Sequence, residues 1–208
     1  MRGAWCVYRK GELVAMKYQE WLVEVPAEIT DDPIWKTEVY RLGLFLGDLA
    51  WYDALKLTLK PPTRSLSDQL YRASGSISAN TCEGYSRASG KDQARFYEYA
   101  LGSARETRDW YFKARHVLGP EITSHRLKLS AQIIRHLLRM IPKYRGESIR
   151  EEAAEYLITP LTDLLENVPM PDHQFTHNAL RTTENAPLPD FQFTHHALRT
   201  TDEETSNE

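Results

Sequence analysis

Four long stretches of this chain repeat apolar residues at steps of three and four, and proline or glycine separates each stretch from the next. Such spacing follows the 3.6-residue turn of an α-helix, and no stretch alternates with the two-residue period of a strand. The breaks fall at Pro61-Pro62, between Gly84 and Gly90, and at Gly119-Pro120. Four amphipathic helices with short connections predict an all-α fold, namely an up-down-up-down four-helix bundle over residues 31–145.

Cap and stop signals place the ends of the predicted helices. Asp31-Asp32-Pro33 joins an acidic cap to a proline at the first helical position, so the first helix is expected from Ile34 to about Leu57. The second is expected to begin at Ser65 or Ser67. The third covers residues 91–118, and the fourth covers residues 121–141, where Pro142 is expected to end it.

Small and polar residues crowd the second predicted helix where leucine is usual. Gly75 lies in the helix interior, where glycine costs roughly 1 kcal/mol relative to alanine. The close approach of a neighbouring helix is the usual compensation, so tight packing is expected at Gly75. Asn80 continues the apolar stripe of Leu70, Ala73 and Ile77 and is expected beside the core.

The two ends of the chain differ from this central domain. Residues 1–30 form a short N-terminal extension in which two interpretations of residues 1–15 stay open: an addition from a start codon upstream of Met16, or a short strand or arm around Trp5 to Tyr8. Residues 146–166 are expected to form a short acidic helical segment, with a further turn at Leu161 to Leu165 after the break at Pro160.

Residues 167–208 form an acidic tail that contains two copies of an 18-residue repeat, at 167–184 and 185–202, identical at 13 of 18 positions. Each copy holds a Pro-x-Pro segment and a helical-looking end, as a tethered recognition peptide does. A duplicated tail with no role is the equal alternative. The candidate partner-binding residues are Phe175, Leu180, Phe193 and Leu198.

Charge is distributed unevenly along the chain. Residues 1–63 carry 8 basic and 9 acidic side chains, residues 64–146 carry 15 and 7, and residues 147–208 carry 3 and 13. A basic middle favours an anionic partner, although solvated helix faces explain individual charges equally well.

Two stripes of basic residues are the candidate nucleic-acid contacts, because such stripes track a phosphate backbone with little sequence readout. Glu98, Glu106 and Asp109 are expected to pair with some of them on the same helix. The candidates are Lys91, Arg95, Arg105, Arg108 and Arg115 on the third helix and Lys128, Arg135, Arg139 and Lys143 on the fourth.

Catalytic and metal-binding patterns are weak. His173 and His177 have a helical ligand spacing, but the second repeat replaces the first of them with Phe191 and no further ligand completes a set. Glu83 is more simply an interhelical partner of a nearby arginine than a catalytic carboxylate. We therefore expect no enzymatic activity, no metal and no cofactor.

The expected compartment follows from simple absences in the sequence. Cys6 and Cys82 lie in unrelated contexts and belong to no Cys/His cluster, which is typical of a reducing cytoplasm. No signal peptide and no run of about 18 apolar residues is found, so we expect a cytoplasmic protein without a membrane span.

Two motifs carry a family resemblance: Ser-Ile-x-x-Asn running into Glu-Gly-x-x-Arg over Ser76–Arg87, and Ala-Leu-Gly-Ser-x-x-Glu over Ala100–Glu106. The region from Pro33 to Arg145 resembles the four-helix bundle family that includes proteins encoded in 23S ribosomal RNA intervening sequences. It is also similar to the accessory variability determinant of diversity-generating retroelements. The resemblance implies a homopentameric ring without enzymatic activity and, in the retroelement members, a basic surface that engages a reverse transcriptase and its RNA. Asn80, Glu83 and Arg87 carry over as structural positions.

Two functions follow from these observations. The first is a homo-oligomeric accessory protein that binds RNA or DNA, together with a partner such as a reverse transcriptase. The second is an oligomeric scaffold that presents the tail repeats to a protein partner and gains affinity from multivalency.

Overall fold

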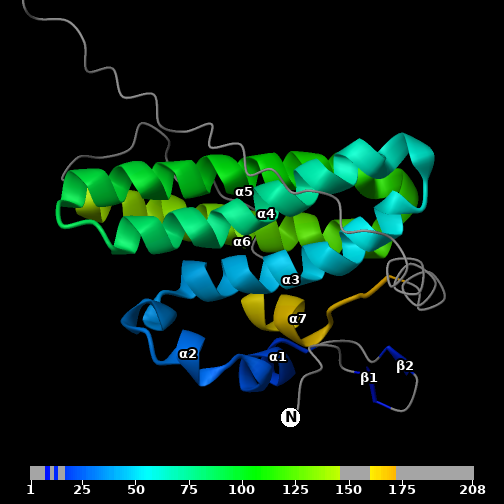
Figure 1. The fold of residues 1–208 in the computed structure, drawn as a ribbon, viewed down its shortest axis with the longest axis horizontal. Helices are drawn as coiled ribbons and strands as arrows, with labels where there is room; N and C mark the ends of the chain where they lie inside the picture. Colours follow the sequence, from blue (N-terminus) through cyan, green and yellow to red (C-terminus); the bar gives the residue numbers. More distant parts are fainter. Residues whose placement is uncertain (1–7, 10–11, 14–16, 146–159, 172–208) are drawn as a thin grey trace, which may run out of the picture.

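The computed structural model describes residues 8–9, 12–13, 17–145 and 160–171. Its main body is four long helices that lie side by side (Figure 1): α3 (Glu38–Thr58), α4 (Arg64–Tyr85), α5 (Gly90–Leu118) and α6 (Pro120–Arg145). Each packs against the next in sequence, and α3 also contacts α6. The predicted all-α fold class is confirmed.

Shorter elements lie on one side of this body, next to α3 (Figure 1). They are the helices α1 (Tyr18–Glu24), α2 (Ala27–Thr30) and α7 (Leu161–Glu166). Two 3₁₀ turns, η1 (Pro33–Lys36) and η2 (Pro61–Thr63), precede α3 and α4. A two-residue strand, β1 (Tyr8–Arg9), pairs antiparallel with β2 (Glu12–Leu13), so the strand considered near Tyr8 exists at that residue.

The N-terminal helix α1 is fixed to α3 by aromatic packing and one polar bond. Tyr18 stacks on Trp21 and meets Phe45 of α3 edge to face, with ring centroids 5.0 Å apart in the second pair. The indole Nε1 of Trp21 donates to the Asp48 carboxylate at 2.6 Å. Tyr18 and Trp21, expected to belong to a simple extension, are therefore part of the core.

The start of α3 differs from the prediction. The Asp32 carboxylate accepts a hydrogen bond from the Ile34 amide (3.0 Å), but it caps η1 rather than the long helix. Thr37 then takes an extended conformation with φ −81° and ψ 114°, which interrupts the helix, and α3 begins at Glu38. Proline at the first position favours a turn, and a single extended residue is enough to end it.

Two further helix ends were predicted wrongly. Helix α4 begins at Arg64, before both proposed serine caps, and the Ser67 hydroxyl instead donates to the Arg64 carbonyl at 2.6 Å. Helix α6 continues past Pro142 to Arg145. An ion pair of Arg145 with Glu98 (2.8 Å) and the packing of Tyr144 on the Tyr97 ring stabilise this last turn.

The expectation of close helix packing at Gly75 was wrong. Gly75 is exposed, and no atom lies within 4 Å of the position that a Cβ would take there. The close contacts occur at other glycines: a Cβ on Gly43 would lie 3.1 Å from Ile77 Cγ2, one on Gly84 would lie 2.7 Å from Tyr97 Cε1, and one on Gly90 would lie 2.7 Å from the Tyr144 carbonyl oxygen. Glycine is required where α3 meets α4 and where α4 meets α5.

A buried ion pair lies at the centre of the helical body. Asp53 of α3 and Arg126 of α6 are both 0% exposed, and Arg126 Nε donates to Asp53 Oδ2 at 2.8 Å. The Tyr111 hydroxyl of α5 donates to the same oxygen at 2.9 Å. Burial, with Asp53 beside it, raises the pKa of Tyr111, so this hydroxyl stays protonated and remains a donor.

The same arginine holds the segment after α6. Arg126 Nη2 donates to the Pro169 carbonyl at 2.9 Å, and Nη1 lies 2.9 Å from His125 Nδ1. Because arginine can only donate, Nδ1 accepts, and His125 Nε2 must carry the hydrogen that bonds the Leu164 carbonyl at 2.6 Å. We call the surface of α6 around His125 and Arg126 the tail seat. The expected turn after Pro160 is thus α7, and the predicted helix at 147–157 lies outside the described residues.

Breaking the buried ion pair on one side should strongly destabilise the protein. Arg126→Met leaves Asp53 buried without its cation, and we expect a loss of about 3–5 kcal/mol in the free energy of unfolding, measured by urea denaturation. Adding Asp53→Leu to Arg126→Met should recover part of that loss. The exposed pair Lys113–Asp109 is the control, since Lys113→Met should cost at most about 1 kcal/mol. Equal losses at the two sites contradict the central role of Arg126.

His125 should make stability depend on pH. Burial, and next the Arg126 charge, lower the pKa of His125 to about 4 in the folded protein, against about 6.5 in the unfolded chain. The unfolded state therefore binds more protons between these values, so stability is full above about pH 6.5 and falls as the pH drops toward 4, by about 3 kcal/mol at most. Urea titrations at several pH values should show this loss, and His125→Gln should remove most of it. The loss persisting unchanged in His125→Gln would refute the assignment.

Candidate nucleic-acid interface

The outward face of α6 carries a row of cations. Lys128, Arg135 and Arg139 fall within about 40° of one another around the helix, opposite the buried Ile133 and Leu137. Lys128 and Arg139 are exposed, and Arg135 is half-buried with Nη1 donating to Gln132 Oε1 at 3.1 Å. Lys143 is exposed at the edge of the same face.

The pKa of His136 is affected by the charged side chains of this face. Burial lowers the pKa of His136, and Glu38, 3.5 Å away, acts in the opposite direction. Arg139 and Arg135 lower it further. These two guanidinium groups therefore add to one local positive potential, which is the condition for attracting an anion.

A second basic row lies on α5, on the side that faces α6. Glu98 marks that side, because it pairs with Arg145 of α6, and Arg105 lies within about 20° of it around the helix. Arg108 and Arg115 continue the row with Phe112, which is 52% exposed. The Arg115 guanidinium lies over the Phe112 ring, 4.1 Å from its centroid. The rows of α5 and α6 thus border one surface, which we call the basic face.

The carboxylates expected to neutralise the α5 row contact other groups. Glu98 pairs with Arg145, Glu106 accepts from Trp110 Nε1 at 3.1 Å, and Asp109 pairs with Lys113 at 2.6 Å. Arg105 of the α5 row also interacts with another group of the protein.

Two of the candidate cations lie away from the basic face. Lys91 lies 14 residues before Arg105, about 21 Å along the helix axis, and Arg95 is turned by about 80–160° from Arg105, Arg108 and Arg115. Both are exposed, and Arg95 pairs with Asp92 at 3.5 Å. We therefore define the basic face by Arg105, Arg108, Arg115, Lys128, Arg135, Arg139 and Lys143.

The three motif positions join α4 to α5. Asn80 Nδ2 donates to the Ser76 carbonyl at 2.8 Å and reaches Ser103 Oγ of α5 at 3.4 Å. Glu83 pairs with Arg87, so its partner lies on the following turn rather than on another helix. The Arg87 guanidinium also covers the Phe96 ring at 4.5 Å. These contacts are structural.

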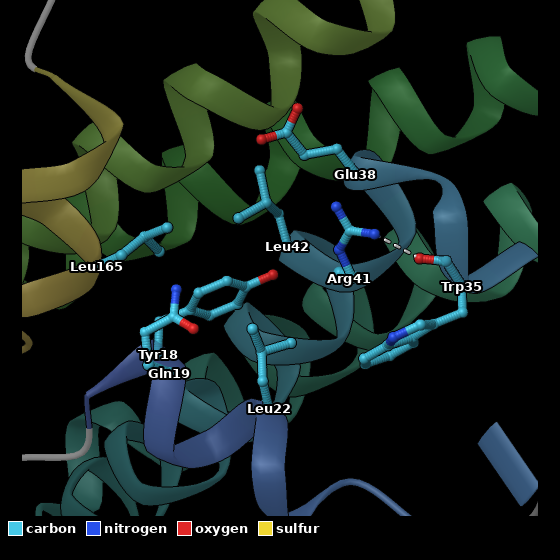
Figure 2. Close-up of a pocket in the computed structure, with 8 residues that line it drawn as sticks. All are labelled: Tyr18, Gln19, Leu22, Trp35, Glu38, Arg41, Leu42 and Leu165. Carbon is cyan, nitrogen blue, oxygen red and sulfur yellow. Dashed lines mark hydrogen bonds between the residues drawn. The ribbon is translucent and has the colours of Figure 1, made fainter. Parts of the chain in front are cut away.

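A pocket of about 330 Å³ lies between α1, α3 and α7 (Figure 2). Arg41 points into it and donates to the Trp35 carbonyl at 2.7 Å, while Glu38 of its wall also contacts His136. Its charged side chains are thus engaged by the protein itself. The remaining lining residues are Tyr18, Gln19, Leu22, Leu42 and Leu165.

The described part of the chain contains neither a membrane-spanning helix nor a metal-binding cluster. No helix there is long and apolar enough to cross a membrane, and no three His, Cys, Asp or Glu side chains there are grouped to hold a metal ion. The candidate partner-binding residues Phe175, Leu180, Phe193 and Leu198 lie outside the described residues.

Sequence reasoning missed Asp53, Arg126 and the tail seat. A signal existed, because both charged residues interrupt apolar stripes: Asp53 continues Leu46, Leu49 and Ala50, and Arg126 lies one turn from Ile122 and Leu129. A lone charge on each of two core stripes predicts a buried pair.

Comparison with known proteins supports the family resemblance. The family model described as 23S rRNA-intervening sequence protein matches residues 49–142. No curated protein and no solved structure matches the chain. The matched range runs from the second half of α3 to the last turn of α6 and includes Asp53, Arg126 and nearly all of the basic face. Residues 49–142 therefore match the 23S rRNA-intervening sequence protein family, in agreement with the resemblance of their motifs.

Proposed function

We propose that this protein is a non-enzymatic, homo-oligomeric accessory protein that binds RNA through its basic face. The observation that carries the proposal is the meeting of two cationic rows on the neighbouring helices α5 and α6. Phosphate groups along a nucleic-acid backbone are the polyanion that such rows fit. RNA is preferred over DNA because the matching family is named for an rRNA intervening sequence.

The composition of the basic face favours structured RNA with unpaired bases. Lysine and arginine rows contact phosphates and carry no base readout. Phe112, exposed beside Arg115, offers a ring on which an unpaired base can stack. Binding should therefore depend strongly on salt and weakly on sequence.

The proposal includes an up-down-up-down bundle that assembles through its α3–α4 face. Trp51 and Tyr71 are 43% and 41% exposed there and touch each other edge to face, with centroids 5.6 Å apart. Gly47 and Gly75 lie on the same face with open space above them. Exposed aromatic rings beside glycines suit the close approach of a helix from a second copy. The pentameric state and the reverse transcriptase partner are taken from the family resemblance.

Charge reversal on the basic face should weaken RNA binding. We expect Arg135→Glu/Arg139→Glu to reduce affinity for a structured RNA at least tenfold, and to lower the slope of log K against log salt by about two or more, because two phosphate contacts are lost. Fluorescence anisotropy at several salt concentrations measures both quantities.

The matched control reverses two exposed cations elsewhere. Lys60→Glu/Arg72→Glu makes the same change in net charge at the start of α4 and in the turn before it. It should leave the salt slope close to that of the natural protein. Equal weakening by both double variants would mean that net charge, and not the basic face, determines binding.

Disrupting the α3–α4 face should dissociate the oligomer without unfolding the chain. In Trp51→Arg, an exposed ring becomes a charge that a self-contact must desolvate, so light scattering should report a fall toward the monomer mass. Tyr99→Arg on α5 is the control, since Tyr99 is 53% exposed on another helix. An unchanged mass for Trp51→Arg, with normal helical circular dichroism, places the interface on another surface.

A further inference from the structure

The tail seat binds a segment that occurs twice in the sequence. Residues 167–171, Asn-Val-Pro-Met-Pro, begin the first repeat, and residues 185–189, Asn-Ala-Pro-Leu-Pro, begin the second. We call them the first head and the second head. The first head is bound: Val168 is 1% exposed, Pro171 is buried, and Met170 packs against the core.

The hydrogen bond that fixes the first head is made to the main chain of the head and not to one of its side chains. Arg126 donates to the main-chain carbonyl of Pro169, and Pro187 supplies the same carbonyl at the same place in the second head. Proline fixes φ near the extended conformation that both heads need, which lowers the entropy lost on binding. Either head can therefore accept this hydrogen bond from Arg126.

The apolar residues of the first head are replaced by similar apolar residues in the second head. Leu188 replaces Met170 at nearly the same volume, and Pro189 matches Pro171. Ala186 is smaller than Val168, so the second head fills less of the space that Val168 occupies. The residues before the second head do not repeat the apolar residues of α7, because Leu164 and Leu165 correspond to Thr182 and Thr183 at the end of the first repeat. The second head should thus be the weaker occupant.

We propose that the second head is an alternative occupant of the tail seat, which it enters when the first head leaves. Thirteen residues, 172–184, separate the heads; such a linker spans roughly 20 Å on average and up to about 45 Å when extended. The two heads compete for one seat, so one Pro-x-Pro segment is always outside it. The exchange releases the first repeat while Arg126 keeps a carbonyl partner. This inference is independent of RNA binding.

A double-mutant cycle in the full chain tests the exchange. Val168→Asp places a charge in the buried position of the first head, and Ala186→Asp makes the same change in the second. Alone, Ala186→Asp should leave the melting temperature unchanged, because the first head fills the seat. In the Val168→Asp background it should lower the melting temperature by a further 3 °C or so, since the substitute occupant is lost.

The control for charge is Val168→Asp/Ala197→Asp, in which the second aspartate lies in the second repeat but outside its head. This double variant should have the same melting temperature as the single variant Val168→Asp. If Ala186→Asp has no further effect on Val168→Asp, or no more than Ala197→Asp has, the second head does not enter the seat and the proposal is wrong.

A second measurement avoids dependence on a destabilised variant. Val168→Ala/Ala186→Val exchanges the distinguishing residues of the two heads and conserves total volume. Amide hydrogen exchange should then show increased protection at Leu188 and decreased protection at Met170, each relative to the natural chain. No gain in protection at Leu188 overturns the proposal.

Discussion

The buried pair of Arg126 and Asp53 is the interaction on which this structure depends. Charges removed from water are costly unless good geometry and further hydrogen bonds offset the lost hydration. Burial would lower the pKa of Arg126, but Asp53 and Tyr111 together hold it above its usual value, so the guanidinium keeps its charge. The partners of Arg126 come from α3, α6 and residues 160–171, and Tyr111 of α5 binds the carboxylate of Asp53. Arg126 therefore fixes the relative positions of all four elements.

The same helix that holds this pair presents the basic face. Helix α6 carries Arg126 on its inner side and Arg135 and Arg139 on its outer side, nine and thirteen residues further along. The inner contact sets the rotation of α6, and rotation decides which cations reach solvent. Lys128 lies three residues, less than one helical turn, after His125, so the basic face and the tail seat adjoin at this point of the helix.

The contacts of the tail seat change the interpretation of the C-terminal repeat. A Pro-x-Pro segment read from sequence looks like a ligand for another protein, yet here its first copy is bound by this domain. Arg126 binds this copy through the main-chain carbonyl of Pro169, and His125 binds the preceding helix α7 through the main-chain carbonyl of Leu164. Such recognition has low sequence specificity, which is why a near-copy of the segment matters.

The sequence by itself determined the all-helical class, the four long helices and most of their buried faces. These depend on local period and on proline and glycine, whose effects are confined to a few neighbouring residues. It also indicated the basic rows on α5 and α6, because helical spacing alone places side chains on one face.

Only the tertiary structure decided which charges are buried, which glycines are crowded and what the chain after α6 binds. Asp53 and Arg126 are 73 residues apart, so no local rule pairs them. Gly43 and Gly84 lie close to neighbouring helices, whereas Gly75 does not. Contacts between residues far apart in the sequence set the rotation of each helix, and this rotation cannot be inferred from the glycines themselves. Pro142 stays helical for the same reason: contacts of Tyr144 and Arg145 with α5 outweigh one missing backbone bond.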